Sequence, residues 1–226
     1  MRAPISVIIP TLAAGDSLPG CAAALFEGLE AGLIREVVIS DGGSDDQTRA
    51  VAERLGAIWL GGPASRGGQL RRGVQAASGD WLLILHADTS LAPGWTGPVI
   101  AHMAGTDAGY FQLAFDRGGW RGRAVACWAN TRARRFGLPY GDQGLLLSRA
   151  LYDAVGGYPD QPLMEDVALA RALTPRLRPI DATAITSAAR YLKGGWARRG
   201  ARNLLTLARY LAGADPTDLA KRYHRR

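Results

Sequence analysis

The sequence contains little cysteine and no long hydrophobic run. Its 226 residues include two cysteines, Cys21 and Cys127, without a CxxC pair or a cysteine–histidine cluster. This scarcity excludes a disulfide framework and a structural zinc site. No apolar stretch approaches the roughly 18 residues that a membrane-spanning helix needs, and the short run from Ile5 to Pro10 is no signal peptide. We therefore expect a soluble, cytoplasmic protein.

The first half of the chain has no excess of basic residues, although the formal net charge of the whole chain is +7. Residues 1–116 hold 7 basic and 12 acidic residues, residues 117–189 hold 10 and 6, and residues 190–226 hold 10 and 2. A protein that coats nucleic acid would not be expected to leave its first half acidic. We therefore expect no nucleic-acid partner.

Short apolar runs alternate with helical patterns through the first half. They predict strands at 5–10, 34–40, 57–60 and 81–85, and helices at 17–31, 46–55 and 67–77. Strands that are apolar on both faces and alternate with helices favour an α/β fold with a mostly parallel sheet.

After residue 88 the pattern is less regular. It predicts strands at 109–115 and 144–148, helices at 94–103, 149–155, 165–173 and 196–212, and a helix or loop at 119–136. The length suits one hydrophobic core with a small extension, which we place at 1–195 and 196–226.

Polar residues follow three of the first four strands: Thr11, Asp41 and Asp88. Ligands of parallel sheets bind beyond the carboxyl ends of the strands. Asp41 and the glycines after it could contact a base or ribose, or simply form a capped turn. Asp88, with diphosphate oxygens, could hold Mg²⁺ or Mn²⁺, or cap the next helix. For His86, a hydrogen-bonding role beside the site is favoured over metal binding.

Two other segments could contact a substrate. Ser65 to Gln69 opens a helix with an arginine and two glycines, a pattern that suits a phosphate group, although no GxxxxGK[ST] loop is present. Glu165 and Asp166 begin another helix, where they could favour the helix dipole or supply a general base. The residues alone leave these alternatives open.

Four segments in a fixed order carry a family resemblance: VIIPT (7–11), SDGGSDD (40–46), HADT (86–89) and MEDVALARAL (164–173). Together they resemble family 2 glycosyltransferases of the GT-A fold, over roughly residues 4–195. SRGGQLRRGVQAASGD (65–80), YGDQG (140–144) and TSAARY (186–191) are similar to a bacterial subgroup of small soluble members. That subgroup is associated with radical SAM and selenodomain proteins and with arsenosugar biosynthesis. The resemblance implies a Rossmann-like sheet flanked by helices, with a C-terminal helical extension.

The resemblance also implies an inverting glycosyltransferase that takes a nucleotide-diphosphate sugar, with UDP favoured, and uses Mn²⁺ or Mg²⁺. Asp166 would be the base, with Glu165 beside it, and Asp88 the metal ligand. Asp142 and Gln143 would line the sugar or acceptor side. The nucleotide-sugar site would comprise Pro10, Thr11, Asp41, Gly43, Ser44, Arg66, Gln69, Ala87, Asp88 and Arg190.

The chain departs from the family pattern at two places. His86 stands where the first carboxylate of a DxD motif would be, so Asp88 becomes the principal protein ligand of the metal. Residues 187–191 read SAARY where many members carry QxxRW, so Arg190 is the candidate for the leaving diphosphate.

Two other classes of function compete with this interpretation. A dehydrogenase lacks support because no GxGxxG follows the first strand. A sugar-phosphate nucleotidyltransferase would be expected to carry a glycine-rich basic loop near the N-terminus, which is absent.

The third alternative is a non-catalytic protein that binds a membrane surface or nucleic acid through the helix at 196–212. An apolar stripe runs along that helix, with arginines on its flanks. The stripe consists of Ala201, Leu204, Leu205, Ala208, Leu211 and Ala212, and the arginines are Arg198, Arg199, Arg202 and Arg209. We expect the stripe to pack on the core, and peripheral contact with the inner membrane face is the alternative.

Overall fold

The apolar runs of the first half form the parallel part of one sheet. The computed structural model describes residues 2–224, so the last two residues of the expected extension lie outside the described part. Strands β1 (Ile5–Thr11), β2 (Ile34–Asp41), β3 (Ile58–Gly61) and β4 (Trp81–Ile84) run parallel in the order β3-β2-β1-β4. Each lies within two residues of its predicted range.

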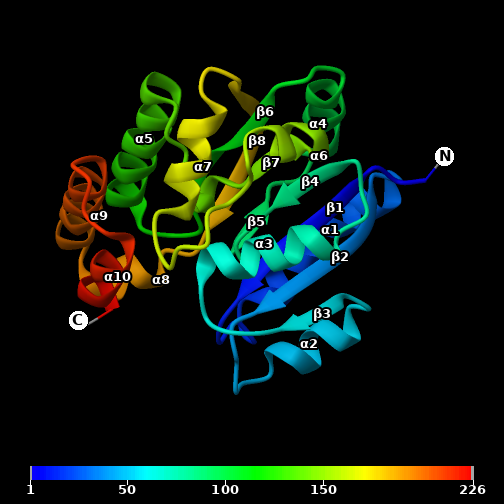
Figure 1. Cartoon of the computed structure of the whole chain (residues 1–226), viewed down its shortest axis with the longest axis horizontal. Coiled ribbons are helices and arrows are strands. Elements are labelled where there is room, and N and C mark those ends of the chain that lie inside the picture. The colour runs from blue at the N-terminus through cyan, green and yellow to red at the C-terminus, as the bar shows by residue number, and fades with distance from the viewer. Residues whose placement is uncertain (1, 225–226) are drawn as a thin grey trace.

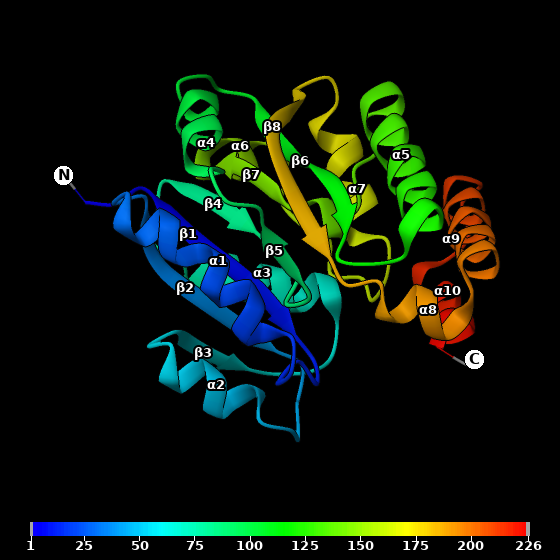
Figure 2. The same cartoon turned by 180° about the vertical axis from the view of Figure 1, so that it is seen from behind.

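The second half continues the same sheet. β7 (Leu145–Ser148) joins β4 in antiparallel fashion, followed by β6 (Ala108–Phe115), β8 (Leu177–Thr186) and β5 (Thr89–Leu91). β6 and β8 are parallel to each other, and β5 is antiparallel to β8. The structure confirms the predicted α/β fold with a mostly parallel sheet between helices (Figures 1 and 2).

Helices cover both faces of the sheet, and each face has its own hydrophobic core. One core joins α1 (Leu18–Glu30), α2 (Thr48–Arg54) and α4 (Thr96–Met103). The other joins α3 (Arg66–Ala76), α6 (Arg149–Ala154) and α7 (Glu165–Leu173). Val7 and Ile9 of β1 belong to the first core and Ile8 belongs to the second. This double burial explains why the strand is apolar at consecutive positions.

The C-terminal helices gather at one side of the molecule, beside α5 (Gly119–Phe136) (Figures 1 and 2). They are α8 (Ala189–Gly194), α9 (Trp196–Leu211) and α10 (Pro216–His224). Leu207 and Leu219 pack with Met164 and Val167 at the start of α7 in a third apolar cluster. Among the described helices, none is long and apolar enough to cross a membrane.

The expectation that α9 buries its leucine stripe is wrong. Leu204, Leu205 and Leu211 are exposed, whereas Thr206 and Leu207 on the opposite side are buried. The helix therefore packs on the molecule through the side that carries fewer leucines.

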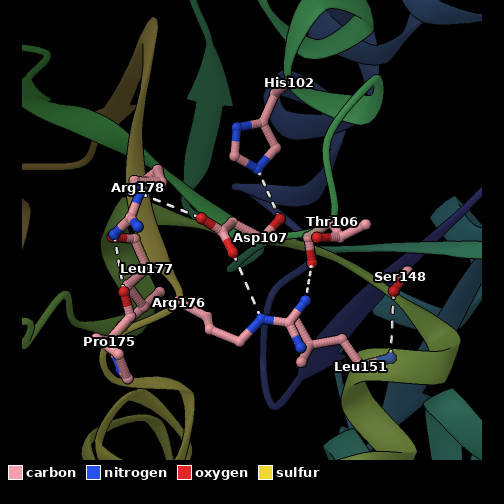
Figure 3. Close-up of polar contacts among 9 residues, drawn as sticks. All are labelled: His102, Thr106, Asp107, Ser148, Leu151, Pro175, Arg176, Leu177 and Arg178. Atoms are coloured by element: carbon pink, nitrogen blue, oxygen red, sulfur yellow. Dashed lines mark hydrogen bonds and ion pairs between the residues drawn. The ribbon is translucent and has the colours of Figure 1, made fainter.

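The starts of β6 and β8 are tied together by a group of charged residues (Figure 3). Asp107 pairs with Arg176 at 3.4 Å and with Arg178 at 3.2 Å, and its carbonyl oxygen lies 2.9 Å from His102 Nε2. Because these side chains are partly exposed, each pair contributes little to stability. The group lies at the ends of β6 and β8 opposite to Phe115 and Thr186, which reach the cavity described below.

Gly67, in the first turn of α3, approaches a distant segment of backbone. Its N–H donates a 3.0 Å hydrogen bond to the Gln161 carbonyl oxygen. A Cβ at this position would lie 2.0 Å from the Pro159 carbonyl oxygen and 2.8 Å from the Gln161 nitrogen. Backbone atoms cannot move aside as the end of a flexible side chain can, so glycine sets how closely α3 meets the segment before α7.

We predict that Gly67→Ala lowers the free energy of unfolding by about 1–3 kcal/mol, because the added methyl group overpacks this contact. Urea denaturation would measure the change. Gly97→Ala in α4 is the matched control, since a Cβ there meets no heavy atom within 4 Å. Alanine is also the better helix former, so the control should be as stable as the parent protein or more so. Equal stability of the two variants would contradict the close contact.

Candidate active site

A cavity of about 600 Å³ opens where β1, β4, β6 and β8 end. Nine of the residues predicted for the site line it: Pro10, Thr11, Arg66, Gln69, Ala87, Asp88, Asp142, Asp166 and Arg190. The cavity thus brings together segments from residue 10 to residue 190. Five predicted residues are outside the described lining: Asp41, Gly43, Ser44, Gln143 and Glu165.

Asp41 holds together the loops that border one side of the cavity. One carboxylate oxygen accepts hydrogen bonds from the Thr11 and Ser44 hydroxyls at 2.8 and 2.5 Å. The other accepts from the N–H groups of Gly43 and Ser44 at 2.8 and 2.7 Å. Although burial opposes ionisation, these hydrogen bonds keep the pKa of Asp41 below its usual value. With the side chain 2% exposed, its visible role is to fix the loop.

Gln69 joins the ends of β1 and β2 from α3. Its buried Nε2 donates to the carbonyl oxygens of Thr11 at 2.7 Å and Ser40 at 3.0 Å. Position 42 favours glycine, because a Cβ there would crowd the Gln69 Oε1 at 3.0 Å. The amide therefore fixes two strand ends at the edge of the cavity, a contact that sequence spacing alone did not show.

His86 and Asp88 follow β4 and face the middle of the cavity. A Cβ on Gly141 would lie 2.3 Å from His86 Nε2, so the imidazole packs directly on the 140–142 turn. Burial lowers the pKa of His86 to about 4, and the positive charge of Arg66 acts in the same direction, while Asp88 and Asp166 oppose it. The imidazole is therefore neutral at physiological pH.

Asp166 lies in the first turn of α7 and faces the cavity. Its two oxygens accept one backbone hydrogen bond each, from Gly141 N at 2.8 Å and from Val167 N at 2.7 Å. A carboxylate oxygen can accept two hydrogen bonds, so each oxygen keeps capacity for a substrate hydroxyl. This geometry suits a general base whose orientation is fixed before the substrate binds.

Glu165, next to Asp166, is buried behind the cavity wall at 1% exposure. Neither of its oxygens has a hydrogen-bond partner in the described part of the chain, and Arg66 Nη1 lies 3.9 Å away. Burial raises the pKa of Glu165 to about 7, the charge of Asp166 adds to the rise, and Arg66 opposes it. Glu165 is therefore partly protonated near neutral pH, whereas an ordinary surface glutamate is fully ionised.

The 140–143 turn supplies the opposite wall. Asp142 lines the cavity, and one of its oxygens is buried without a partner among the described residues. Burial raises the pKa of Asp142 to about 6. The Tyr140 hydroxyl is likewise buried and has no hydrogen-bond partner in the described part of the chain, while the Arg132 guanidinium lies 3.4 Å from the centre of the Tyr140 ring. Unsatisfied groups of this kind are uncommon in folded proteins and indicate a place that a ligand completes.

Gln143 lies behind this wall. Its side chain is fully buried, and Nε2 donates to the Phe111 carbonyl oxygen at 3.2 Å and to Asn130 Oδ1 at 3.3 Å. The structure thus separates two neighbours that the sequence analysis had grouped: Asp142 faces the cavity, and Gln143 supports the turn from inside.

The donor set around Asp88 fits a metal ion that shares its ligands with a substrate. Within residues 2–224, no group of three or more His, Cys, Asp or Glu side chains could hold a metal ion by itself. Asp88 contributes one carboxylate, and a bound diphosphate would add oxygen ligands of the kind that Mg²⁺ and Mn²⁺ prefer.

The profile of the family described as "Glycosyl transferase family 2" matches residues 6–137, more than half of the chain. The chain belongs to glycosyl transferase family 2. The matched region contains β1 to β6 and the segments that carry Thr11, Arg66 and Asp88. Asp166 and the C-terminal helices lie beyond it. No curated protein matches the sequence significantly.

Solved structures of other glycosyltransferases share this fold. A glucosyl-3-phosphoglycerate synthase from Mycobacterium tuberculosis, crystallised with Mn²⁺, UDP and glucosyl-3-phosphoglycerate, is 20% identical with a TM-score of 0.58. That alignment covers 90% of this chain and 79% of the synthase. A mannosyltransferase from Pyrobaculum calidifontis, in complex with GDP-Man and Mn²⁺, is 16% identical with a TM-score of 0.65, covering 96% and 67% of the two chains. S. aureus TarS in complex with UDP-GlcNAc is 15% identical with a TM-score of 0.61, covering 81% and 58%. At these identities the likeness shows the GT-A fold.

This family 2 glycosyltransferase completes its cavity with residues that the sequence analysis did not assign to the site. Tyr191, Arg199, Asn203 and Tyr223 line the cavity from α8, α9 and α10. Arg199 Nη2 donates to the Tyr223 hydroxyl at 3.1 Å, and Asn203 Nδ2 donates to the Tyr191 hydroxyl at 3.1 Å. The only available signal was the four-residue spacing of Arg199 and Asn203, which places both on one side of a helix.

The raised pKa of Glu165 predicts a pH-dependent stability. Because its folded-state pKa lies above the ordinary value of 4.5, its stabilising contribution is complete below about pH 4.5 and is lost as pH rises through about 7. Glu165→Gln removes this titration. The free energy of unfolding of the parent protein should therefore fall, relative to the variant, by on the order of 1 kcal/mol or more from about pH 5 to about pH 8.

Urea denaturation at several pH values would test this expectation. Glu53→Gln is the matched control, since the Glu53 carboxylate is exposed and pairs with Arg49 within one helix. A difference between parent and Glu165→Gln that does not change with pH would show that burial does not disfavour the Glu165 charge.

Proposed function

We propose that this glycosyltransferase moves a sugar from a nucleotide-diphosphate sugar, with UDP as the favoured nucleotide, to an acceptor hydroxyl with inversion at the anomeric carbon. The observation that carries the proposal is the pairing of Asp88 and Asp166 in one cavity, with the Asp166 carboxylate held by two backbone N–H groups. The Mn²⁺ complexes of UDP and GDP-Man among the neighbours support a diphosphate donor and a divalent ion.

The donor would lie along the part of the cavity wall that the first half of the chain supplies, from Pro10 and Thr11 to Ala87 and Asp88. Arg66 is available there to a phosphate group, since its Nη1 lies 3.9 Å from the nearest Glu165 carboxylate oxygen, which is a long ion pair. The loop beside this wall is held in place by Asp41, Gly43 and Ser44. The backbone of these residues is the part that could approach the nucleobase of the donor. Mn²⁺ or Mg²⁺, held by Asp88 and the diphosphate, would supply positive charge against the leaving phosphates.

The acceptor would enter from the side of Asp142, Tyr191 and Arg199. Asp166 would take the proton of the acceptor hydroxyl, whose oxygen forms a bond to the anomeric carbon as the bond to the diphosphate oxygen breaks. Arg190 lines the cavity and could stabilise the charge that develops on the leaving group. A single displacement of this kind inverts the configuration. The similarity to the subgroup associated with arsenosugar biosynthesis suggests an acceptor or product of that chemistry.

We predict that Asp166→Asn lowers kcat by roughly 10²–10⁴-fold, because general-base help of this size is lost. Donor binding should be retained, since asparagine preserves the shape of the side chain and can still accept a hydrogen bond. Transfer rates and calorimetric donor binding would measure the two effects. Asp153→Asn, on the exposed part of α6, is the matched control and should keep full activity. Unchanged turnover in Asp166→Asn would remove this residue from the mechanism.

We also predict that divalent metal and donor bind cooperatively. With one protein carboxylate available, Mn²⁺ alone should bind weakly in calorimetric titrations, and a nucleotide-diphosphate sugar should strengthen its binding. A thermal-shift panel of nucleotide sugars with and without Mn²⁺ would identify the donor, because a ligand that binds the folded state raises its stability. Tight Mn²⁺ binding in the absence of nucleotide would contradict the shared site, and Asp88→Asn should abolish the synergy.

A further inference from the structure

Exposed apolar side chains are concentrated on three helices that contact each other. Among residues 2–224, seven of the thirteen large exposed hydrophobic residues belong to α5, α8 and α9. They are Trp120, Trp128, Phe136, Leu192, Leu204, Leu205 and Leu211. α9 contacts both α5 and α8, so the helices that carry these residues gather at one side of the molecule (Figure 2). Single exposed leucines are ordinary, but such a gathering marks an interaction surface.

The same helices carry positive charge only. α5, α8 and α9 contain eleven arginines and lysines and no aspartate or glutamate, whereas the rest of the chain has 16 basic and 20 acidic residues. Arg121, Arg123, Arg134 and Arg135 on α5 and Lys193, Arg198 and Arg209 on α8 and α9 are exposed. The net charge of the rest of the protein is therefore negative, and the excess positive charge is concentrated on these three helices.

α9 turns its apolar side away from the protein. The exposed residues Ala201, Leu204, Leu205, Ala208 and Leu211 recur every three or four positions, so they form one outward stripe. Arg198 and Arg209 are exposed beside it. α5 repeats the arrangement, with Trp120, Ala124, Cys127 and Trp128 exposed and Gly122, Ala126, Ala129 and Ala133 buried. Each helix thus has an apolar outer side flanked by arginines.

We propose that the outer side of α5, α8 and α9 is a docking surface for an anionic lipid bilayer. A helix with an apolar side, a basic polar side and little acidic charge is of the kind that lies in the membrane interface. Exposed tryptophans favour the headgroup region, and each basic residue near an anionic surface adds to the attraction. This proposal concerns a surface outside the catalytic cavity and does not depend on the donor or the acceptor.

Two other occupants fit the surface less well. The phosphates of a nucleic acid would bind the arginines, but they would leave the outward leucine stripe exposed to water. A second copy of this chain would bring two surfaces of the same positive charge together, which opposes self-association. A bilayer that contains anionic lipid satisfies both the charge and the apolar side chains.

The test is co-sedimentation of the full chain with vesicles of phosphatidylcholine alone or mixed with phosphatidylglycerol. We expect binding to the mixed vesicles only, weakened by salt, since the Debye length shortens as ionic strength rises. The double variant Leu204→Gln/Leu205→Gln should bind at least about 10-fold more weakly, because it removes two apolar side chains from contact with lipid. Arg198→Gln/Arg209→Gln should lose affinity by roughly 10-fold as well.

Matched controls lie on the other side of the fold. Leu29→Gln on α1 and Arg54→Gln on α2 change equally exposed residues and should bind vesicles as the parent does. Circular dichroism would verify that all variants are folded. Transfer measured without vesicles should be unchanged in the leucine variant, so a failure of docking is distinguishable from a failure of the proposed activity.

Three results would overturn the proposal. Equal vesicle binding by the parent and the leucine variant would show that the apolar stripe of α9 does not contact the lipid. Binding to a DNA duplex that survives the leucine changes, with no binding to vesicles, would assign the charge to nucleic acid. A concentration-dependent dimer in sedimentation equilibrium that the leucine variant loses would make the surface a self-association site.

Discussion

The contact between Gly67 and the backbone at Pro159 and Gln161 joins the two halves of the site. One half, from Pro10 to Asp88, is built on the parallel strands and would hold the donor. The other half begins at Phe115 and includes Asp142 and Asp166. Because Gly67 has no side chain, α3 can approach the segment before α7 closely enough to form a backbone hydrogen bond. Arg66 and Glu165 are thereby set opposite each other across the same junction.

At the start of α7, two features of this arrangement are energetically unfavourable. Met164 has a φ of 63°, a left-handed conformation that is uncommon for a residue other than glycine. Glu165 is buried, and neither of its oxygens has a hydrogen-bond partner among the residues that the structure describes. Both features disfavour the folded state, and surrounding packing has to offset them. Leu207 and Leu219 from the C-terminal helices supply part of that packing around Met164. The C-terminal helices therefore help to hold the residue that precedes the proposed base by two positions.

The sequence predicted what depends on local pattern and missed what depends on distant contacts. β1 to β4 and α7 were recognisable because consecutive apolar residues or helical spacing mark them. β8 was missed because Arg178, Pro179 and Asp181 interrupt its pattern, and its position in the sheet comes from pairing with β6. Asp142 and Gln143 are neighbours in sequence, but only the three-dimensional turn shows that one faces the cavity and the other lies behind it. The outward direction of the α9 stripe was equally invisible, since a helical period does not tell which side is covered.

The two sides of α9 belong to two different environments. Arg199 and Asn203 line the cavity, while Leu204 and Leu205, the next residues along, face outward. A rigid helix cannot shift one side without the other, so any change in how α9 sits on the protein would reshape the cavity wall at Arg199. By thermodynamic linkage, a ligand that prefers one position of the helix inside the cavity would then alter affinity at the outer surface, and the reverse would hold with equal strength. In this protein, ligand binding in the cavity and attachment of the enzyme to a surface would both depend on one conformational equilibrium, the position of α9.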